Sequence, residues 1–457
     1  MSGPRSLFRS ARHLSRSDCE DLARRTLAFA TADETRITIT SGTQGNTRFA
    51  VNQISTAGDS YNAAVTVQSS VGKRSASSTT NRLEDDALRA TVQTAERLAR
   101  LSPEDPEAMP LLGPQGYTDG PGWSDASALL EPAERAAAVR QIADPARAAQ
   151  LVATGYLEAN AGSFAVATSR GLFAYTRSTS TALTTTVRTP DGTGSGWGGA
   201  SHYDFARIDP AALGGRAIEK ARLSRSPVAI EPGRYTVVLE PTAVGNLVQL
   251  ISGALNARAA DEGRSFFSRQ GGGNKIGAKV VDERVTLVSD PLDPEGPAAP
   301  FTAEGLPVTR TVWIENGIVR NLAYDRYWAE RQSRPSSTVG GTLRMSGGSM
   351  TVDQMVASTR RGLLITRFWY IRPVDPRTIL YTGLTRDGTF LIENGRITRA
   401  VKNLRFNESP IFMLNNIEAM GQPVRVSASE AGGPGAAIVV PALRVRDFTF
   451  TSLSDAI

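Results

Sequence analysis

Alternating polar and apolar positions dominate the first half of the chain and predict an antiparallel sheet. In residues 36–40, Ile37 and Ile39 alternate with Arg and Thr, and such alternation is typical of a half-buried strand. The same kind of pattern, with polar turns between the runs, predicts strands at residues 46–54, 61–68, 71–79, 163–168, 172–177 and 181–188. Because the turns are short, we expect an antiparallel meander. The Gly-rich run 191–199 is interpreted as a mobile loop.

Apolar residues at helical spacing predict helices around these strands. The helices are expected at residues 18–31, 83–101, 132–150 and 208–223. Asn81 is the expected N-cap of the second helix, with Glu84 three residues later. Repeated prolines predict a loop over residues 102–128.

The pattern changes near residue 228, after which strands predominate. Residues 234–239 predict a strand, and Leu247, Leu250 and Ile251 have the spacing of a helix over 244–262. Two Asn-Gly pairs between apolar runs predict hairpins, at residues 316–317 and 394–395. A short apolar helix is expected at residues 411–420, with Ser409 as its cap.

These elements predict an α+β protein without regular βα alternation, which excludes a doubly wound fold. We expect a loosely ordered N-terminus over residues 1–17. An N-terminal α+β domain, an antiparallel sheet with helices, is expected over residues 18–225, and a C-terminal β-rich domain over 228–457.

The numbers of histidines and cysteines limit the metal, disulfide and imidazole chemistry that the chain can perform. The 457 residues include two histidines, His13 and His202, and one cysteine, Cys19. A paired-His zinc motif, a Cys-x-x-Cys site and an intrachain disulfide are therefore excluded. Imidazole chemistry would have to use His13 or His202. We interpret His202 as a loop histidine in preference to a catalyst.

The net charge of +6 is small, and basic residues are interleaved with acidic ones, so no nucleic-acid partner is expected. Four arginines precede the first acidic residue, Asp18, but no apolar run of a secretory signal follows them. No stretch of about 18 apolar residues could span a membrane. We therefore expect no membrane partner and a cytoplasmic location, which the lone cysteine also fits.

The densest polar cluster lies at the end of the predicted helix 244–262. It contains Arg258, Asp261, Glu262 and Arg264. Their spacing fits a salt-bridged helix end, but it also fits a carboxylate–guanidinium catalytic site beside a cleft. The glycine-rich run that follows lacks the Gly-Lys-Ser/Thr ending of a phosphate loop, so we expect no nucleotide cofactor.

Several short motifs occur in a fixed order over roughly residues 19–450. They are RFAVNQI at 48–54, GLPVTR at 305–310, IENG at 314–317 and again at 392–395, YDRYWA at 324–329, GLLIT at 362–366, NIEAMG at 416–421 and PALRV at 441–445. Together they resemble the TldD/PmbA family of modulator-of-gyrase and peptide-maturation proteases. The resemblance implies a barrel-like C-terminal domain and assembly as dimers.

The resemblance also implies two kinds of subunit. TldD-like chains hold zinc with a His-Glu and a second His on a helix and a Cys near the C-terminus, whereas PmbA-like (TldE) chains lack these ligands. Here the helix over 244–262 contains no His, and Ser427 and Ser429 occupy the region of the expected Cys. We therefore predict a PmbA/TldE-like chain with no metal site and no cofactor.

Three functions remain open. The first is a metal-free subunit that binds unfolded peptide and pairs with a zinc-bearing TldD-like chain, or with itself, in peptide degradation or maturation. The second is a stand-alone, metal-independent enzyme that uses Arg258, Asp261, Glu262 and Arg264 as an acid–base cluster, with burial raising a carboxyl pKa. The third is a non-enzymatic peptide-binding scaffold.

Overall fold

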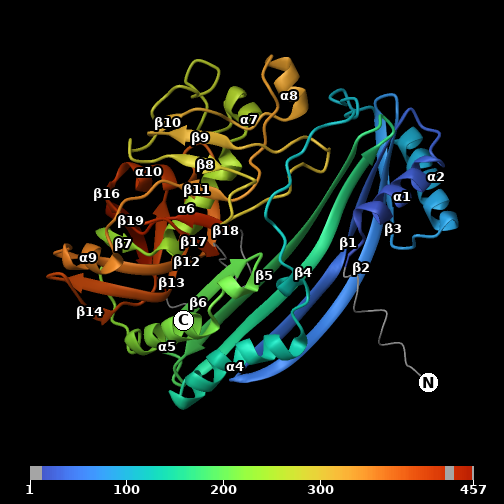
Figure 1. Ribbon diagram of the computed structural model, residues 1–457. Coiled ribbons are helices and arrows are strands. Elements are labelled where there is room, and N and C mark those ends of the chain that lie inside the picture. Colours follow the sequence, from blue (N-terminus) through green and yellow to red (C-terminus); the bar gives the residue numbers. More distant parts are fainter. Residues whose placement is uncertain (1–12, 428–436, 455–457) are drawn as a thin grey trace, which may run out of the picture.

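The computed structural model describes residues 13–427 and 437–454, which form an N-terminal half with a large sheet and a β-rich C-terminal half (Figure 1). The first half contains a six-stranded antiparallel sheet with the strand order β3-β2-β1-β4-β5-β6. Its strands are β1 (Glu34–Ala50), β2 (Gln53–Val71), β3 (Arg74–Thr80), β4 (Val152–Thr168), β5 (Phe173–Arg188) and β6 (Ser195–His202). The prediction of an N-terminal antiparallel sheet is confirmed.

The strands are longer than predicted because glycines that look like strand breaks lie inside them. Most of the predicted strands 36–40 and 46–54 form one strand, β1. Gly42 of β1 lies opposite Gly162 of β4, and a Cβ on Gly42 would be 2.5 Å from the carbonyl oxygen of Ala161. Glycine is needed here because the two strands approach closely, and no turn is involved.

The prediction of a mobile loop at 191–199 is wrong for its second part. Residues from Ser195 onward belong to β6, which pairs with β5. A Cβ on Gly196 would be 2.1 Å from the carbonyl oxygen of Ala217 in the helix that covers β6. The glycine therefore lets this helix lie directly on the strand.

Helices cover one face of the sheet. Ile37 and Ile39 of β1 are buried beneath the first two long helices, and Phe49 of the same strand is buried beneath the third. The second helix begins after Glu84 without a side-chain cap, so the prediction of Asn81 as N-cap is wrong. The elements of this layer are α1 (Arg16–Leu27), α2 (Asp85–Leu101), α3 (Asp125–Ala128), α4 (Pro132–Ala148), the 3-10 turn η2 (Phe205–Arg207) and α5 (Pro210–Leu223).

Five strands of the C-terminal half close into a barrel. The order runs β12-β7-β19-β15-β13, and β13 pairs back with β12. The aromatic rings of Phe368, Phe406, Phe448 and Phe450 pack together within its core. The barrel strands are β7 (Gly233–Leu239), β12 (Arg361–Asp375), β13 (Leu380–Glu393), β15 (Leu404–Glu408) and β19 (Leu443–Leu453), with β14 (Arg396–Ala400) and β16 (Ile417–Met420) attached. The α+β fold class with a barrel-like C-terminal part is confirmed.

A second, six-stranded sheet lies beside the barrel, with the order β10-β9-β8-β11-β18-β17. Helix α6 (Pro241–Ala254) joins the two, because its apolar residues share one core with both. The strands are β8 (Leu287–Ser289), β9 (Thr311–Glu315), β10 (Ile318–Val319), β11 (Leu343–Met345), β17 (Val424–Ser427) and β18 (Ala437–Val440).

Four short helices complete this half: α7 (Ala257–Asp261), α8 (Arg326–Arg331), α9 (Val352–Ala357) and α10 (Pro410–Asn415). The predicted helix 411–420 is wrong beyond residue 415, where the strand β16 follows. Its predicted cap is confirmed, since the Ser409 hydroxyl accepts a hydrogen bond from the Ile411 amide at 3.2 Å. Both predicted Asn-Gly hairpins are also present, between β9 and β10 and between β13 and β14.

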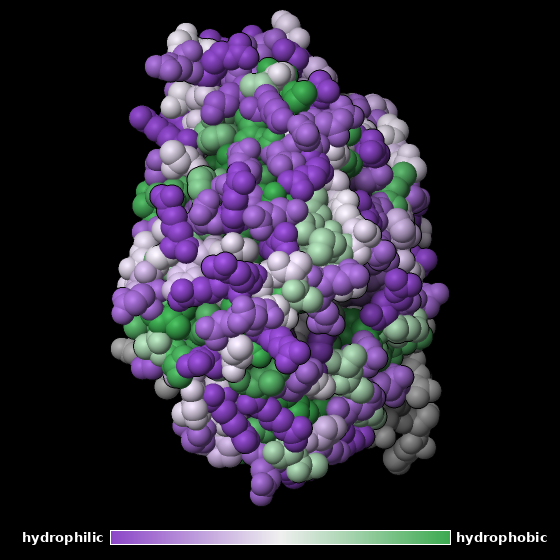
Figure 2. Space-filling model, turned by 90° about the vertical axis from the view of Figure 1, so that its left-hand side faces the viewer, coloured by the Kyte–Doolittle hydropathy of each residue, from purple (hydrophilic) through white to green (hydrophobic). Residues whose placement is uncertain are grey.

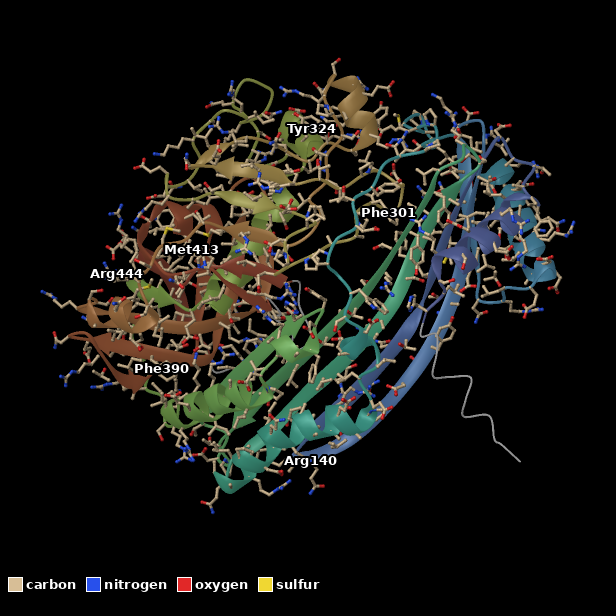
Figure 3. The ribbon with its side chains drawn as sticks, viewed as in Figure 1. Arg140, Phe301, Tyr324, Phe390, Met413 and Arg444 are labelled. Carbon is tan, nitrogen blue, oxygen red and sulfur yellow. The ribbon has the colours of Figure 1, made fainter. Side chains whose placement is uncertain are left out.

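An aromatic contact joins the two halves at strand β4, inside the large sheet. Phe301, labelled in Figure 3, comes from the C-terminal half and is 2% exposed. Its ring stacks 5.5 Å from Phe164 of β4 and lies 5.1 Å from Tyr117. The Tyr117 hydroxyl also donates a hydrogen bond to the Gly305 carbonyl at 2.7 Å.

Figure 2 shows the barrel side of the molecule, where hydrophilic side chains cover most of the surface and apolar ones form separate small patches. Among the described residues, no helix is both long and apolar enough to cross a membrane.

Candidate functional site

The predicted polar cluster lies on a helix of its own. The predicted single helix 244–262 is wrong: α6 ends at Ala254, and α7 begins after Asn256, whose side chain accepts from the Ala259 amide at 2.8 Å. Between the two helices, the Leu255 carbonyl and the Ala257 amide both bond to the backbone of Ala323. These bonds to another segment take the chain out of the helical path.

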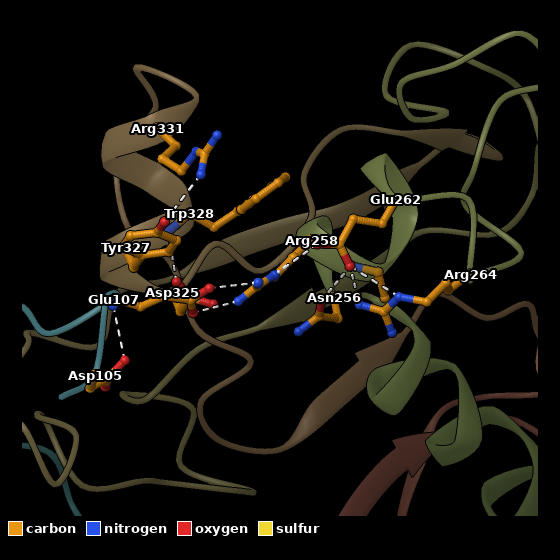
Figure 4. Close-up of polar contacts among 11 residues, drawn as sticks. Asp105, Glu107, Asn256, Arg258, Glu262, Arg264, Asp325, Tyr327, Trp328 and Arg331 are labelled. Carbon is orange, nitrogen blue, oxygen red and sulfur yellow. Dashed lines mark hydrogen bonds and ion pairs between the residues drawn. The ribbon is translucent and has the colours of Figure 1, made fainter. Parts of the chain in front are cut away.

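Arg258 is the centre of the cluster (Figure 4). Its two terminal nitrogens donate to both carboxylate oxygens of Glu107, at 2.6 and 2.7 Å. Its Nε donates to Glu262 at 3.0 Å, and Glu262 also accepts from Arg264. Three of the four predicted residues therefore share one network, and Glu107 is a partner that the sequence did not reveal.

Asp261 points away from this network. Its carboxylate accepts hydrogen bonds from Asn274 Nδ2 and from the Trp328 indole nitrogen, each at 2.7 Å. The indole ring of Trp328 also lies under the Arg258 guanidinium, 5.3 Å from centroid to Cζ. Asp261 therefore positions the ring on which Arg258 stacks.

The charges of the cluster oppose acid catalysis. Hydrogen bonds from Arg264 and Arg258 lower the pKa of Glu262, and Arg258 lowers the pKa of Glu107. The premise that burial raises a carboxyl pKa here is therefore wrong for Glu262. A carboxylate held ionised by guanidinium groups is a poor general acid. The geometry fits a structural role, in which the bidentate ion pair between Arg258 and Glu107 holds the segment around Glu107 against α7. We call this ion pair the clamp.

Glu107→Gln and Arg258→Gln should each make residues 102–124 more susceptible to limited proteolysis, because either change removes the bidentate ion pair of the clamp. Cleavage sites and rates are measured by mass spectrometry under native conditions. Arg331→Gln is the matched control, since Arg331 lies near the same rings but bonds to the hydroxyl of Tyr327 and not to Glu107. Equal cleavage rates in all three variants would contradict the clamp.

A cavity of about 570 Å³ lies where the helix-free face of the sheet meets the C-terminal half. It is lined by Ser178 and Ser180 of β5, by His202 at the end of β6, by Arg425 of β17 and by Pro297. Within the described chain, β6 pairs only with β5 and β17 only with β18. Two strand edges therefore meet at this cavity.

His202 and Arg425 both line this cavity, and the sequence did not predict that they lie together. The prediction that His202 lies in a loop is wrong, because it is the last residue of β6 and 6% exposed. Arg425 Nε donates to the Ser201 carbonyl at 2.5 Å across 224 positions of sequence. No local pattern signals a contact over that separation.

Three family models match the chain in order. They describe PmbA/TldA metallopeptidase domain 1 over residues 37–99, the central domain over 124–225 and the C-terminal domain over 232–452. The chain belongs to the PmbA/TldD metallopeptidase family. This confirms the family that the short motifs indicated.

Curated relatives match part of the chain. A metalloprotease of Methanothermobacter thermautotrophicus is 26% identical over 275 residues, which is 55% of this chain and 58% of the relative. A metalloprotease TldD homolog of Buchnera aphidicola is 25% identical over 258 residues, 51% of each chain. The chain thus spans about half the length of the curated relatives it matches.

Solved structures match the fold over nearly the whole chain. TldE from Thermococcus kodakarensis superposes with a TM-score of 0.81 at 18% identity and covers 95% of this chain and 99% of its own. A putative modulator of DNA gyrase from Thermotoga maritima gives 0.80 at 17% identity and covers 95% and 100%. At these identities the likeness shows the fold.

The residues that the structure describes offer no ligand set for the metal in the family's description. Helix α6 offers amides and hydroxyls but no imidazole, and its buried Asn246 already accepts from the Phe368 amide at 3.1 Å. Ser427 is buried on β17, and Ser429 lies outside the described residues. In residues 13–427 and 437–454, no three His, Cys, Asp or Glu side chains lie close enough to hold a metal ion.

Proposed function

We propose that this chain is a zinc-free, TldE-like subunit of a peptidase, which binds unfolded peptide and pairs with a zinc-bearing TldD-like chain. The observation that carries the proposal is a family fold in which α6 has no imidazole while a cavity remains open between the two halves. In this scheme the partner performs the metal chemistry, and this chain encloses and holds the substrate.

The cavity supports peptide as the ligand. The helix-free face of the sheet next to it carries small uncharged groups: Thr40, Gly42, Gln44, Asn62, Asn160, Gly162, Ser178 and Ser180. Such groups hydrogen-bond to a main chain without selecting particular side chains. The edges of β6 and β17 add backbone donors and acceptors to which an extended peptide adds as a further strand.

Purified alone, the chain should contain no stoichiometric zinc and should not hydrolyse an unfolded peptide. Metal content is measured by elemental mass spectrometry and hydrolysis with a fluorogenic unstructured peptide. Adding a TldD-like chain from the same genome should produce a complex on size exclusion and peptide turnover. About one zinc ion per chain in the protein alone would overturn the metal-free assignment.

The same experiment distinguishes the alternatives. A stable homodimer that neither binds the TldD-like chain nor changes its turnover would contradict the partnership. Turnover by the lone chain that is lost in Asp261→Ala or Glu262→Ala would instead support the stand-alone enzyme.

A further inference from the structure

His202, which lines the cavity, has one buried hydrogen-bond donor that has no partner among the described residues. Its Nδ1 accepts from the Asp204 amide at 2.9 Å, so the ring hydrogen of the neutral imidazole lies on Nε2. Nε2 is inaccessible to solvent and has no hydrogen-bond partner among the described residues. Burial, together with nearby Arg425, lowers the pKa of this ring, which keeps it neutral.

Arg425 has a second buried hydrogen-bond donor of this kind. Nε is engaged by Ser201, but Nη1 is buried and makes no hydrogen bond within the described chain. Two carboxylates interact electrostatically with Arg425, those of Glu295 and Asp293, and each already forms an ion pair with another arginine. Asp293 binds Arg344 at 2.7 and 3.0 Å, and Glu295 binds Arg207 at 3.0 Å. A buried guanidinium without a carboxylate of its own is costly, and an anionic ligand relieves that cost.

The other charged groups of the cavity leave this donor pair free. Arg177 of β5 adds a positive charge at the wall, 4.5 Å from the Trp123 ring. Glu158 of β4 is the carboxyl group on the opposite side, and it accepts from Asn160 at 3.4 Å. Among the described residues it forms no ion pair with Arg425. Burial raises the pKa of Glu158, which weakens its competition with an incoming anion.

We propose that this cavity binds a carboxylate group of the peptide, with one oxygen accepting from Arg425 Nη1 and the other from His202 Nε2. The inference rests on the proposed function, because the carboxylate is taken to belong to a bound peptide. The group is either the C-terminal carboxylate or an Asp or Glu side chain. A carboxylate has two acceptor oxygens, one for each donor, whereas a backbone carbonyl presents one oxygen.

The test measures peptide affinity by fluorescence anisotropy with the purified full-length chain. Three labelled unstructured peptides of one sequence are compared: a free acid without Asp or Glu, its C-terminal amide, and the amide with one internal Glu. The free acid should bind roughly tenfold more tightly than the plain amide. If the Glu-containing amide binds as tightly as the free acid, the site accepts a side-chain carboxylate as well as the C-terminal one. If only the Glu-containing amide binds tightly, the site is specific for side chains, and if only the free acid does, it is specific for the C-terminus.

Variants of the two donors decide whether this site is responsible. Arg425→Gln and His202→Phe should each reduce the difference between free acid and amide, while affinity for the plain amide is unchanged. Glu158→Gln is a variant that leaves both donors in place and removes the opposing charge, so it should increase the preference for the free acid. It keeps the test informative if a donor variant misfolds.

The possible failures are distinguishable. Equal affinity of wild type for all three peptides would overturn the carboxylate site and leave peptide binding intact. An acid preference that survives both donor substitutions would also overturn it. Absence of binding to all three peptides would overturn peptide binding itself, and with it the carboxylate site.

Discussion

Asp387→Ala should lower the free energy of unfolding by about 3–5 kcal/mol, because it removes one partner of a buried ion pair. Arg367 Nη1 lies 3.7 Å from Asp387 Oδ2, and the two side chains are only 3% and 4% exposed. The Arg367 guanidinium also lies over the Trp197 ring, 4.6 Å from its centroid. Ser195 donates a hydrogen bond to the same carboxylate.

The contacts of this pair with Ser195 and Trp197 join the two halves of the molecule. Ser195 and Trp197 belong to β6 of the large sheet, whereas Arg367 and Asp387 belong to β12 and β13 of the barrel. We therefore expect the substitution to weaken the cohesion between the halves as well as the total stability. The measurement is urea unfolding followed by circular dichroism and by tryptophan fluorescence, whose two curves should separate if the halves unfold independently.

Two controls separate the causes. Asp387 has a positive φ of 54°, which Asn tolerates and Ala does not. Asp387→Asn therefore removes the charge without adding backbone strain, and it should cost less than Asp387→Ala. Ser195→Ala removes one hydrogen bond, worth about 1 kcal/mol. A loss below about 1 kcal/mol in Asp387→Ala would show that the buried pair does not hold the halves together.

The sequence predicts elements whose signal is local. Alternation at Ile37 and Ile39 identifies a strand because one face of β1 is buried under helices. It does not predict that β1 continues through Gly42, because that depends on Gly162, 120 residues away on the neighbouring strand. The break between α6 and α7 is hidden for the same reason, since it depends on backbone bonds to Ala323.

The candidate sites show the same limit. The spacing of Arg258 and Glu262 predicts their contact, because residues four apart share a helix face. Glu107, which makes the bidentate pair, lies 151 positions earlier, so the sequence leaves open whether the cluster is a clamp or a catalyst. The donors His202 and Arg425 come together only because the edges of two separate sheets meet. The sequence therefore predicted the family, whereas the cavity could be found only in the structure.

Glu408 should make the stability of the chain fall as the pH rises from about 4.5 to about 7. It is 4% exposed at the end of β15, and burial raises its pKa to about 7. Its two oxygens accept from the amides of Ser409 at 3.0 Å and Thr449 at 3.1 Å. These bonds, and nearby Arg234, reduce the shift without cancelling it.

The sign follows from proton binding. In the unfolded chain this carboxyl loses its proton near its ordinary pKa of 4.5, whereas in the folded chain it keeps the proton until about pH 7. Between these values the folded state binds more protons than the unfolded state, so raising the pH favours unfolding. The stabilisation is complete below about pH 4.5 and lost above about pH 7, and it amounts to roughly 3 kcal/mol.

Glu408→Gln is the matched control, because its amide stays neutral at every pH. The free energy of unfolding is measured by urea denaturation for both proteins at intervals from pH 4.5 to pH 8. The variant carries a constant cost, since its amide nitrogen cannot accept from one of the two backbone amides. All other titrating groups are common to both proteins, so the difference between the two curves isolates Glu408.

Wild type should lose about 3 kcal/mol of unfolding free energy relative to the variant across this range. Parallel curves, or a relative gain by wild type at high pH, would show that this buried carboxyl is ionised in the folded barrel at neutral pH and does not control its stability.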